Sequence, residues 1–304
     1  MPESPVIARV IARDDPAAAF ELHRSYLRGL AYRMLSSMAE AEDAVQDAYI
    51  RWHRIGARAR GAIDNPRAWL SKATTRLCLD RLKSARVQRE TYIGPWLPEP
   101  VIEPEAAVDP AELAQDLSVA FLLLLERLSP LERAAFLLHD VFDMSFAQVA
   151  GVLRRDEAAC RQLAARARKH IAAGRPRFDA RSEDRARIAA AFLAAAGSGD
   201  PAQLARVLAE DAVLITDGGG KAKAALNPIA GRDKIIAFVL GVRRKAPFPD
   251  GTEFRPSVIN GLPGFLIVRP DGTIDQTLSF DVQDGTVRHI YAVRNPDKLR
   301  AIKA

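Results

Sequence analysis

The chain has 304 residues, of which 48% are hydrophobic, and its 44 basic and 38 acidic side chains give a net charge of +6. This length suits two or three domains, and the ordinary composition excludes a disordered chain. The two cysteines, Cys78 and Cys160, exclude a disulfide scaffold and a cysteine metal cluster. The longest apolar run, Val119 to Leu125, is too short to span a bilayer, and we expect no secretory signal. A soluble cytoplasmic protein of several domains is therefore expected.

Charge is arranged in blocks along the chain. Residues 51–90 hold 11 basic and 3 acidic side chains, residues 91–116 hold six acidic side chains and no basic one, and residues 154–177 hold eight basic and two acidic ones. Two basic blocks on either side of an acidic one favour two nucleic-acid contacts over a uniformly solvated surface. Chance clustering on exposed helices is the alternative for either block alone.

The first predicted domain, residues 16–90, shows helical patterning and no run of alternating apolar residues. In its segment Ala39–Trp52 the apolar side chains share one helix face. The opposite face carries Asp43, Gln46, Asp47 and Arg51.

A second long helix is predicted to begin at Asn65-Pro66 and to continue to Glu90. It combines an aromatic ring with many positive charges, in Trp69, Lys72, Arg76, Arg81, Lys83 and Arg86. Single-stranded DNA binds to that combination, because a base stacks on the ring while the charges follow the backbone. The alternative for Trp69 is a core tryptophan.

Five prolines between residues 95 and 110 predict an extended linker over residues 91–115. A second helical domain follows over residues 116–175. It contains two capping boxes, Ser129–Glu132 and Ser145–Gln148, each of which predicts a helix start. The helix after the second box is short, and a basic helix capped by Asp156 follows it, which predicts a helix-turn-helix.

Polar and basic side chains of the turn and the third helix are candidates to contact DNA, namely Arg155, Arg161, Gln162, Arg166 and Lys169. Arginine and glutamine can read base edges in the major groove, and the other positive charges can bind phosphates. The alternative is a three-helix bundle that does not touch DNA. Arg154 stands where the turn often has glycine, and a positive φ there would cost on the order of 1 kcal/mol.

The last predicted domain, residues 180–304, begins with helices and continues with short apolar segments that predict strands. Asp271-Gly272 and Asp284-Gly285 lie between such segments and predict hairpins, so the domain is expected to be α+β. Asp217, Asp281 and His289 are candidate polar pocket residues, with a structural histidine as the alternative. No nucleophile–base pair, metal-ligand spacing or phosphate loop is identifiable, so we expect no cofactor and no metal.

These segments together resemble the extracytoplasmic-function sigma factors of the sigma-70 family. The segment AEDAVQDAYIRW resembles the helix of region two that binds core polymerase, and Asn65–Glu90 resembles the reader of the promoter −10 element. Leu128–Ile171 resembles region four, which reads the −35 element. The resemblance implies a protein that performs no catalysis itself, binds core RNA polymerase and directs promoter recognition. It places Asp43, Gln46, Asp47 and Arg51 on the coiled coil of the largest polymerase subunit.

The resemblance also implies that region four binds the flap of the second-largest subunit. The loop before the −10 helix would help to capture the melted DNA strand through Arg58, Arg60 and Asp64.

Three pentapeptides resemble the hallmarks of one subgroup, whose members carry a C-terminal SnoaL-like extension with a cone-shaped α+β fold. They are WLPEP (Trp96, Leu97, Pro98, Glu99, Pro100), DGGGK (Asp217, Gly218, Gly219, Gly220, Lys221) and NPDKL (Asn295, Pro296, Asp297, Lys298, Leu299). The implied fold is two all-α sigma domains followed by this α+β domain. The implied role of the extension is a fused regulator that packs on WLPEP and on the sigma domains, so that no separate anti-sigma factor is required.

Two other functions remain open from the sequence. One is a SnoaL-like enzyme fused to a DNA-binding sensor, which would need an internal acid–base pair. The other is a helix-turn-helix repressor that uses the extension as a ligand sensor and binds duplex DNA without polymerase.

Overall fold

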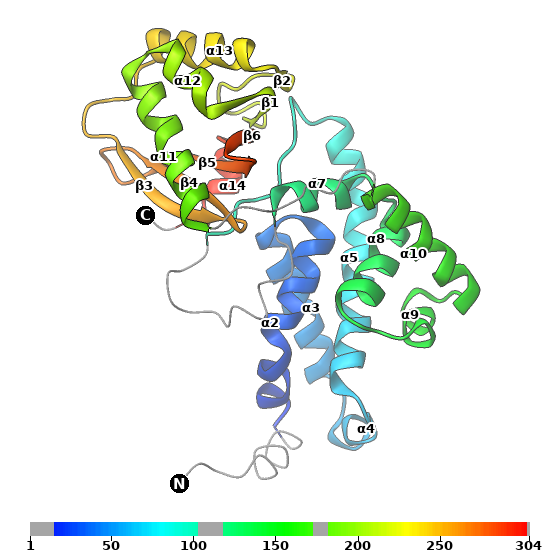
Figure 1. The fold of residues 1–304 in the computed structure, drawn as a ribbon. Helices are drawn as coiled ribbons and strands as arrows, with labels where there is room; N and C mark the ends of the chain where they lie inside the picture. The colour runs from blue at the N-terminus through cyan, green and yellow to red at the C-terminus, as the bar shows by residue number, and fades with distance from the viewer. Residues whose placement is uncertain (1–14, 103–117, 173–181, 303–304) are drawn as a thin grey trace. The chain divides into compact units, whose positions relative to one another are not determined.

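A computed structural model describes residues 15–102, 118–172 and 182–302, the side chains of residues 84–90 and 182 excepted (Figure 1). These residues divide into two compact units. The first comprises residues 15–88 and 124–172, and the second comprises residues 89–102, 118–123 and 182–302. The described part of the predicted linker therefore belongs to the C-terminal unit. None of the described helices combines the length and the apolar character that crossing a membrane requires.

The first unit begins with helices whose starts are set by polar caps. Asp15 accepts a hydrogen bond from the Ala17 amide at the start of α2 (Pro16–Leu35), and Ser37 accepts one from Glu40 at the start of α3 (Met38–His53). The short α4 (Ala57–Gly61) leads to α5 (Pro66–Glu90), where the Asn65 side chain caps the Ala68 amide. The apolar sides of these helices are buried at Leu27, Leu30, Trp52 and Leu70.

The second half of this unit contains the predicted helix-turn-helix. It runs from the last residues of α7 (Val119–Glu126), which enters this unit at Leu124, through α8 (Pro130–Phe136) and the π-helical turn η1 (Leu137–Val141) to α9 (Phe146–Leu153) and α10 (Glu157–Ala172). Both predicted capping boxes are confirmed, because Ser129 and Glu132 bond reciprocally, as do Ser145 and Gln148. Arg154 ends α9 in the left-handed region, at φ 54° and ψ 49°.

A buried arginine joins the two halves of the first unit. Arg133 of α8 is 2% exposed, and its guanidinium lies 2.8 Å from the Glu126 carboxylate. It also donates to the carbonyl oxygens of Leu125 at 2.8 Å and of Met34, in α2, at 2.7 Å. Ser36 donates to the same Glu126 carboxylate at 2.7 Å. Because a buried guanidinium is costly without such partners, this network favours one packing of α8 on α2.

The second unit is an α+β domain built on a six-stranded sheet of order β2-β1-β6-β5-β4-β3. The strands are β1 (Leu208–Asp217), β2 (Ile229–Ala230), β3 (Glu253–Ile259), β4 (Leu262–Val268), β5 (Ile274–Gln283) and β6 (Thr286–Val293). β1 pairs with β6 in parallel, and all other neighbours are antiparallel. This confirms the predicted α+β class.

Both predicted hairpins are confirmed, and they differ in the type of their turns. Asp284 and Gly285, between β5 and β6, both have positive φ, which is the conformation of the type I′ turn that Asp-Gly prefers. At Asp271-Gly272 only the glycine has positive φ, because the turn is a longer loop in which the Asp271 carboxylate accepts from the Thr273 amide.

The two faces of the sheet are covered differently. The helices α11 (Ser182–Ser198), α12 (Pro201–Val207) and α13 (Arg232–Lys245) pack on one face, over a core that includes Phe192, Phe280 and Ile290. The opposite face packs against the linker and the short α14 (Pro296–Leu299), around Leu97 and Tyr291. Figure 1 shows these elements grouped around the sheet.

Candidate functional site

The predicted polymerase-binding face lies on the outer side of α3. Asp43, Gln46 and Arg51 are exposed there. Asp47 is only partly exposed, since its carboxylate pairs with Arg81 of α5 at 2.8 Å. This ion pair joins one residue expected to contact polymerase to one expected to contact DNA.

The two tryptophans of the first unit pack together. Trp52 is buried and donates from its indole nitrogen to the Pro16 carbonyl at 3.0 Å. Trp69 is half-buried, with its ring centroid 5.4 Å from that of Trp52. Trp69 therefore has a packing role and an exposed part at the same time.

The other predicted contacts of this region differ in availability. Arg58 and Asp64 are exposed, Lys72 is half-buried, and Lys83 pairs with Asp80 at 2.9 Å. Arg60 donates to the Ile55 carbonyl at 2.8 Å. The Arg86 side chain lies outside the described residues.

Arg76 connects the predicted −10 helix to the helix-turn-helix. Its guanidinium donates to the carbonyl oxygens of Val152 and Gly151, at 3.1 Å each, at the end of α9. Those carbonyls belong to the last turn of a helix, where backbone acceptors lack intrahelical partners and attract positive charge. In this conformation Arg76 is held by the first unit itself.

The exposed side of α10 carries the predicted −35 contacts. Arg155, Gln162 and Lys169 are exposed. Arg161 pairs with Glu157 at 3.1 Å, and Arg166 pairs with Glu132 at 3.1 Å. Both guanidinium groups are themselves exposed, and an ion pair of an exposed arginine is weak, so a phosphate can compete for these arginines.

The predicted regulatory motifs meet in the second unit at the carboxylate of Asp217, the last residue of β1. Asp217 is fully buried. Its Oδ1 accepts from the Tyr92 hydroxyl at 2.5 Å, and its Oδ2 accepts from the Leu97 amide at 2.9 Å and from the Lys298 ammonium at 2.7 Å. Three donors from the linker and from α14 thus satisfy one buried charge. We call Tyr92, Leu97, Asp217, Asn295 and Lys298 the clasp.

The clasp residues also bond to one another, in addition to their bonds to Asp217. Lys298 also donates to the Leu97 carbonyl, and its ammonium lies 4.1 Å from the centroid of the Trp96 ring. Asn295 donates from its amide to the Tyr92 oxygen at 2.8 Å and caps α14. Burial and the bond to Asp217 raise the pKa of Tyr92 well above its usual value, so the phenol keeps its proton.

The glycines of DGGGK are needed because the loop lies against its neighbours. A Cβ at Gly218 would lie 2.2 Å from the Ala222 carbonyl oxygen. At Gly219, φ is +59° and a Cβ would lie 2.3 Å from the Asn295 amide nitrogen. Lys221 of the same motif pairs with Asp297. DGGGK is therefore bound to NPDKL by this ion pair in addition to the bond between Asp217 and Lys298.

The WLPEP segment lies along the domain beyond the clasp. Leu97 is buried with Val119, Tyr291 and Leu299, and Pro98, Glu99 and Pro100 are buried as well. At its far end Val101 donates to the Asn260 side chain at 3.1 Å, and Ile102 forms a bridge to Ile259 of β3. The segment is therefore bound at two places.

The candidate pocket residues of the last domain do not form one site. Asp281 is fully buried, and its Oδ2 accepts from Gln283 at 3.0 Å and lies 3.1 Å from the Nδ1 atom of His289. The His289 ring stacks on Tyr291, with 5.9 Å between centroids. Asp217 lies instead at the clasp, so the three residues do not share a pocket. Within the described chain, no group of three or more His, Cys, Asp or Glu side chains has the arrangement of a metal site.

Comparisons with known proteins agree with the two halves of the first unit. Residues 19–87 match the family profile of Sigma-70 region 2, and residues 118–171 match that of Sigma-70, region 4. The chain is 38% identical over 292 residues to "ECF RNA polymerase sigma factor SigJ" of Mycobacterium tuberculosis H37Rv, which covers 92% of each chain. This chain belongs to the extracytoplasmic-function sigma factors. As a sigma factor, it directs core RNA polymerase to promoters through regions 2 and 4.

One further relative and one solved structure extend the comparison of this sigma factor. "Probable ECF RNA polymerase sigma factor SigI" of M. tuberculosis CDC 1551 is 38% identical over 204 residues, covering 65% of this chain and 69% of SigI. The crystal structure of M. tuberculosis SigJ superposes with a TM-score of 0.74 at 36% identity, over 93% of this chain and 98% of SigJ. The fold of this sigma factor, including the α+β extension, thus has a solved counterpart.

Sequence reasoning missed two residues that the clasp and its far end require. Tyr92 and Asn260 lie outside the three pentapeptides, and each makes its contact with a residue more than 100 positions away. A tyrosine four positions before Trp96 has no local pattern that would mark it. Asn260 carries a weak signal, because Asn260-Gly261 is a turn pair between two apolar segments.

Proposed function

We propose that the C-terminal domain of this sigma factor restrains its activity by holding the linker between regions 2 and 4. The observation that supports this proposal is the clasp, in which one buried carboxylate binds Tyr92 and Leu97 of the linker together with Lys298. The domain would act as a fused regulator, so that no separate anti-sigma factor is required, and the protein would act in the cytoplasm with the polymerase.

The restraint follows from the length of the tether. The −10 and −35 elements are about 25 base pairs apart, which is about 85 Å along B-DNA. Between α5 and α7 the chain has 28 residues, 91–118. Extended, they reach at most about 100 Å, whereas residues 103–118 alone reach at most about 60 Å. Holding residues 91–102 therefore fixes about two fifths of the tether on the C-terminal domain, and only the remainder is left to reorient region 4 relative to region 2.

Activity also requires the DNA-contacting helix to be available. Arg76 is bonded to α9 when regions 2 and 4 are packed together. We propose that polymerase binding through the α3 face (Asp43, Gln46, Asp47, Arg51) and through region 4 separates the two regions. Arg76, Trp69 and the loop before α5 then contact the melted strand, and the basic side of α10 contacts the −35 duplex.

The test is promoter-specific transcription with reconstituted holoenzyme. Asp217→Asn keeps the shape of the side chain but removes the charge that pairs with Lys298. A charge-assisted bond is worth about 1.5–3 kcal/mol, so release of the linker should become about tenfold easier or more. We expect transcription to rise several-fold with unchanged affinity for core polymerase.

The matched control is Asp211→Asn, in the same strand, where the carboxylate is exposed and pairs with Arg288 at 3.2 Å. This variant should transcribe like the wild type. Unchanged transcription by Asp217→Asn would reject restraint through the clasp, and failure of the wild-type chain to bind core polymerase would reject the mechanism as a whole.

We also propose that the protein performs no catalysis. The Asp281–His289 pair is the feature that would favour the enzyme alternative. The Nδ1 atom of His289 bonds to Asp281 Oδ2, which also accepts from Gln283, and the imidazole lies parallel to the Tyr291 ring, so these contacts already fix the histidine in place. The second oxygen of Asp281, Oδ1, is buried without a hydrogen-bond partner among the described residues and is the one feature of the pair that favours the enzyme alternative.

A further inference from the structure

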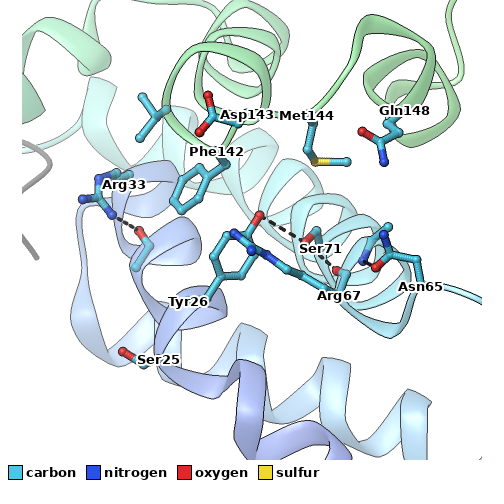
Figure 2. Close-up of a pocket in the computed structure, with 13 residues that line it drawn as sticks. Ser25, Tyr26, Arg33, Asn65, Arg67, Ser71, Phe142, Asp143, Met144 and Gln148 are labelled. Carbon is cyan, nitrogen blue, oxygen red and sulfur yellow. Dashed lines mark hydrogen bonds between the residues drawn. The ribbon is translucent and has the colours of Figure 1, made fainter. Parts of the chain in front are cut away.

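A cavity of about 390 Å³ lies inside the first unit, where α2 and the start of α5 face the turn between η1 and α9. Figure 2 shows Tyr26, Arg67 and Ser71 on the region 2 side, and Phe142, Met144 and Gln148 on the region 4 side. This volume lies at the lower end of the range, about 300–1,000 Å³, that is typical of small-molecule sites. The cavity is separate from the clasp and from the exposed side of α10.

The charge lining the cavity is positive. The Arg67 guanidinium lies over the ring of Tyr26, 3.9 Å from its centroid, and has no hydrogen bond or ion pair with any described residue. Arg33 lies over Phe142 at 5.5 Å and donates to the Gly29 carbonyl. Asp143 is the acidic residue among the lining side chains. Two arginines against one carboxylate favour an anionic ligand.

Neutral donors add to this preference. The Asn65 oxygen is occupied by the Ala68 amide, and the Gln148 oxygen is occupied by the Ser145 amide. Both side chains therefore keep their NH₂ groups as donors, one from each side of the cavity. The cavity also borders the N-terminus of the 25-residue helix α5, where the helix dipole favours negative charge.

The remaining lining explains why an inorganic anion would not fill the site. Phe142, Met144 and Val141 give the region 4 side an apolar wall. Met144 is buried, and the Phe142 ring meets Tyr26 edge to face at 4.9 Å between centroids. A ligand that combines an anionic group with a flat apolar body would meet both kinds of surface.

We propose that this cavity binds a small organic phosphate of the size of a nucleoside monophosphate. Its phosphate lies toward Arg67 and the start of α5, and its ring system lies against Phe142 and Met144. Because region 2 and region 4 each supply part of the lining, the ligand binds only while they are packed together. Bound ligand therefore favours the conformation in which Arg76 is bonded to α9. The effect of bound ligand on transcription, through this conformation, rests on the proposed function. The binding of the ligand to the cavity does not.

The test is calorimetric titration of the full-length protein with adenosine 5′-monophosphate, and separately with adenosine and with inorganic phosphate. We expect one site for the monophosphate, at least tenfold tighter than for either part alone. Arg67→Gln should weaken binding at least tenfold. Ser25→Glu, which places negative charge at an exposed lining position, should weaken it as well.

The matched control is Arg24→Gln, on the same helix as Tyr26 but outside the cavity, where the arginine is 62% exposed and pairs with Glu21. It should bind like the wild type. Absence of binding by the adenosine, guanosine and cytidine monophosphates would overturn the site, as would unchanged affinity in both Arg67→Gln and Ser25→Glu.

These results are separable from the proposed function. Binding of the monophosphate by a chain that does not bind core polymerase would support the site and reject the regulatory mechanism. Promoter-specific transcription without monophosphate binding would reject the site alone.

Discussion

Arg154 ends α9 in a backbone conformation that L-residues adopt at a cost of about 1 kcal/mol. Glycine is free of this cost but adds entropy to the unfolded chain, so Arg154→Gly should stabilise the protein by at most about 1 kcal/mol. The substitution also removes a neighbouring positive charge that, together with burial, lowers the pKa of Arg76. We expect the midpoint of thermal unfolding to rise by at most about 2–4 °C.

The neighbouring residue provides the control for this prediction. Arg155 is also exposed, but its φ is not positive. Arg155→Gly therefore gains nothing in the folded state and loses the entropy that a glycine adds to the unfolded chain, so its midpoint should stay the same or fall. A lower midpoint for Arg154→Gly would show that the arginine side chain contributes more than its backbone costs.

At the scale of elements, two substitutions on α10 can distinguish a residue that binds a DNA phosphate from a residue that reads a base. Lys169 is exposed, and if it binds a phosphate, Lys169→Ala should reduce the slope of log K against log salt by about 0.9. Gln162→Ala should instead cost about 1–3 kcal/mol for the preferred base and relax specificity at that position. Fluorescence anisotropy of holoenzyme on a −35 duplex measures both.

The control for α10 lies in the C-terminal domain. Lys234 of α13 is exposed and belongs to neither sigma region, so Lys234→Ala should change neither the salt slope nor the specificity. Equal slopes for Lys169→Ala and the wild type would place Lys169 away from the DNA backbone.

The elements also show which parts of the fold could be predicted from sequence. The capping boxes at Ser129 and Ser145 were predictable because their partners lie three residues away. β3 gives no strand signal, because it is an edge strand with mostly exposed side chains and an internal proline, Pro256, and therefore lacks an alternation of buried side chains. The start of α13 gives no capping signal, because Gly231 stands at its N-cap and has no side chain.

Contacts between distant segments were beyond sequence reasoning even where the residues had been identified. Arg76 and Asp217 were both named as candidates from the sequence. The partners of Arg76 are backbone carbonyls 75 and 76 positions away, and Tyr92 lies 125 positions from Asp217. Every residue has a backbone carbonyl, so the sequence does not indicate which carbonyl accepts a bond from Arg76. No local periodicity links residues so far apart. The motif resemblance brought WLPEP, DGGGK and NPDKL together, but the buried carboxylate at their centre came from the structure.

At the scale of the whole chain, the linker belongs to the domain that would regulate it. Residues 89–102 and 118–123 group with the C-terminal unit, so the connection between regions 2 and 4 is also part of that domain's structure. A separate anti-sigma factor would have to find its target by diffusion, whereas a fused domain faces its own linker at a high effective concentration. The strength of the clasp, rather than the concentration of a partner, then sets the restraint.

Truncation after Arg294 tests this arrangement because it removes Asn295, Lys298 and Leu299 while the sheet stays complete to Val293. The Asp217 carboxylate loses its ammonium partner, and Leu97 loses an apolar neighbour, so the linker should be released. We expect promoter-specific transcription to rise several-fold at unchanged affinity for core polymerase, and residues 92–102 to exchange amide hydrogens faster. Truncation after Ile302, which keeps α14, should match the full chain in both measurements. Faster exchange with lower transcription would mean that the held linker supports initiation. The C-terminal domain would then activate transcription, which would contradict the proposed restraint.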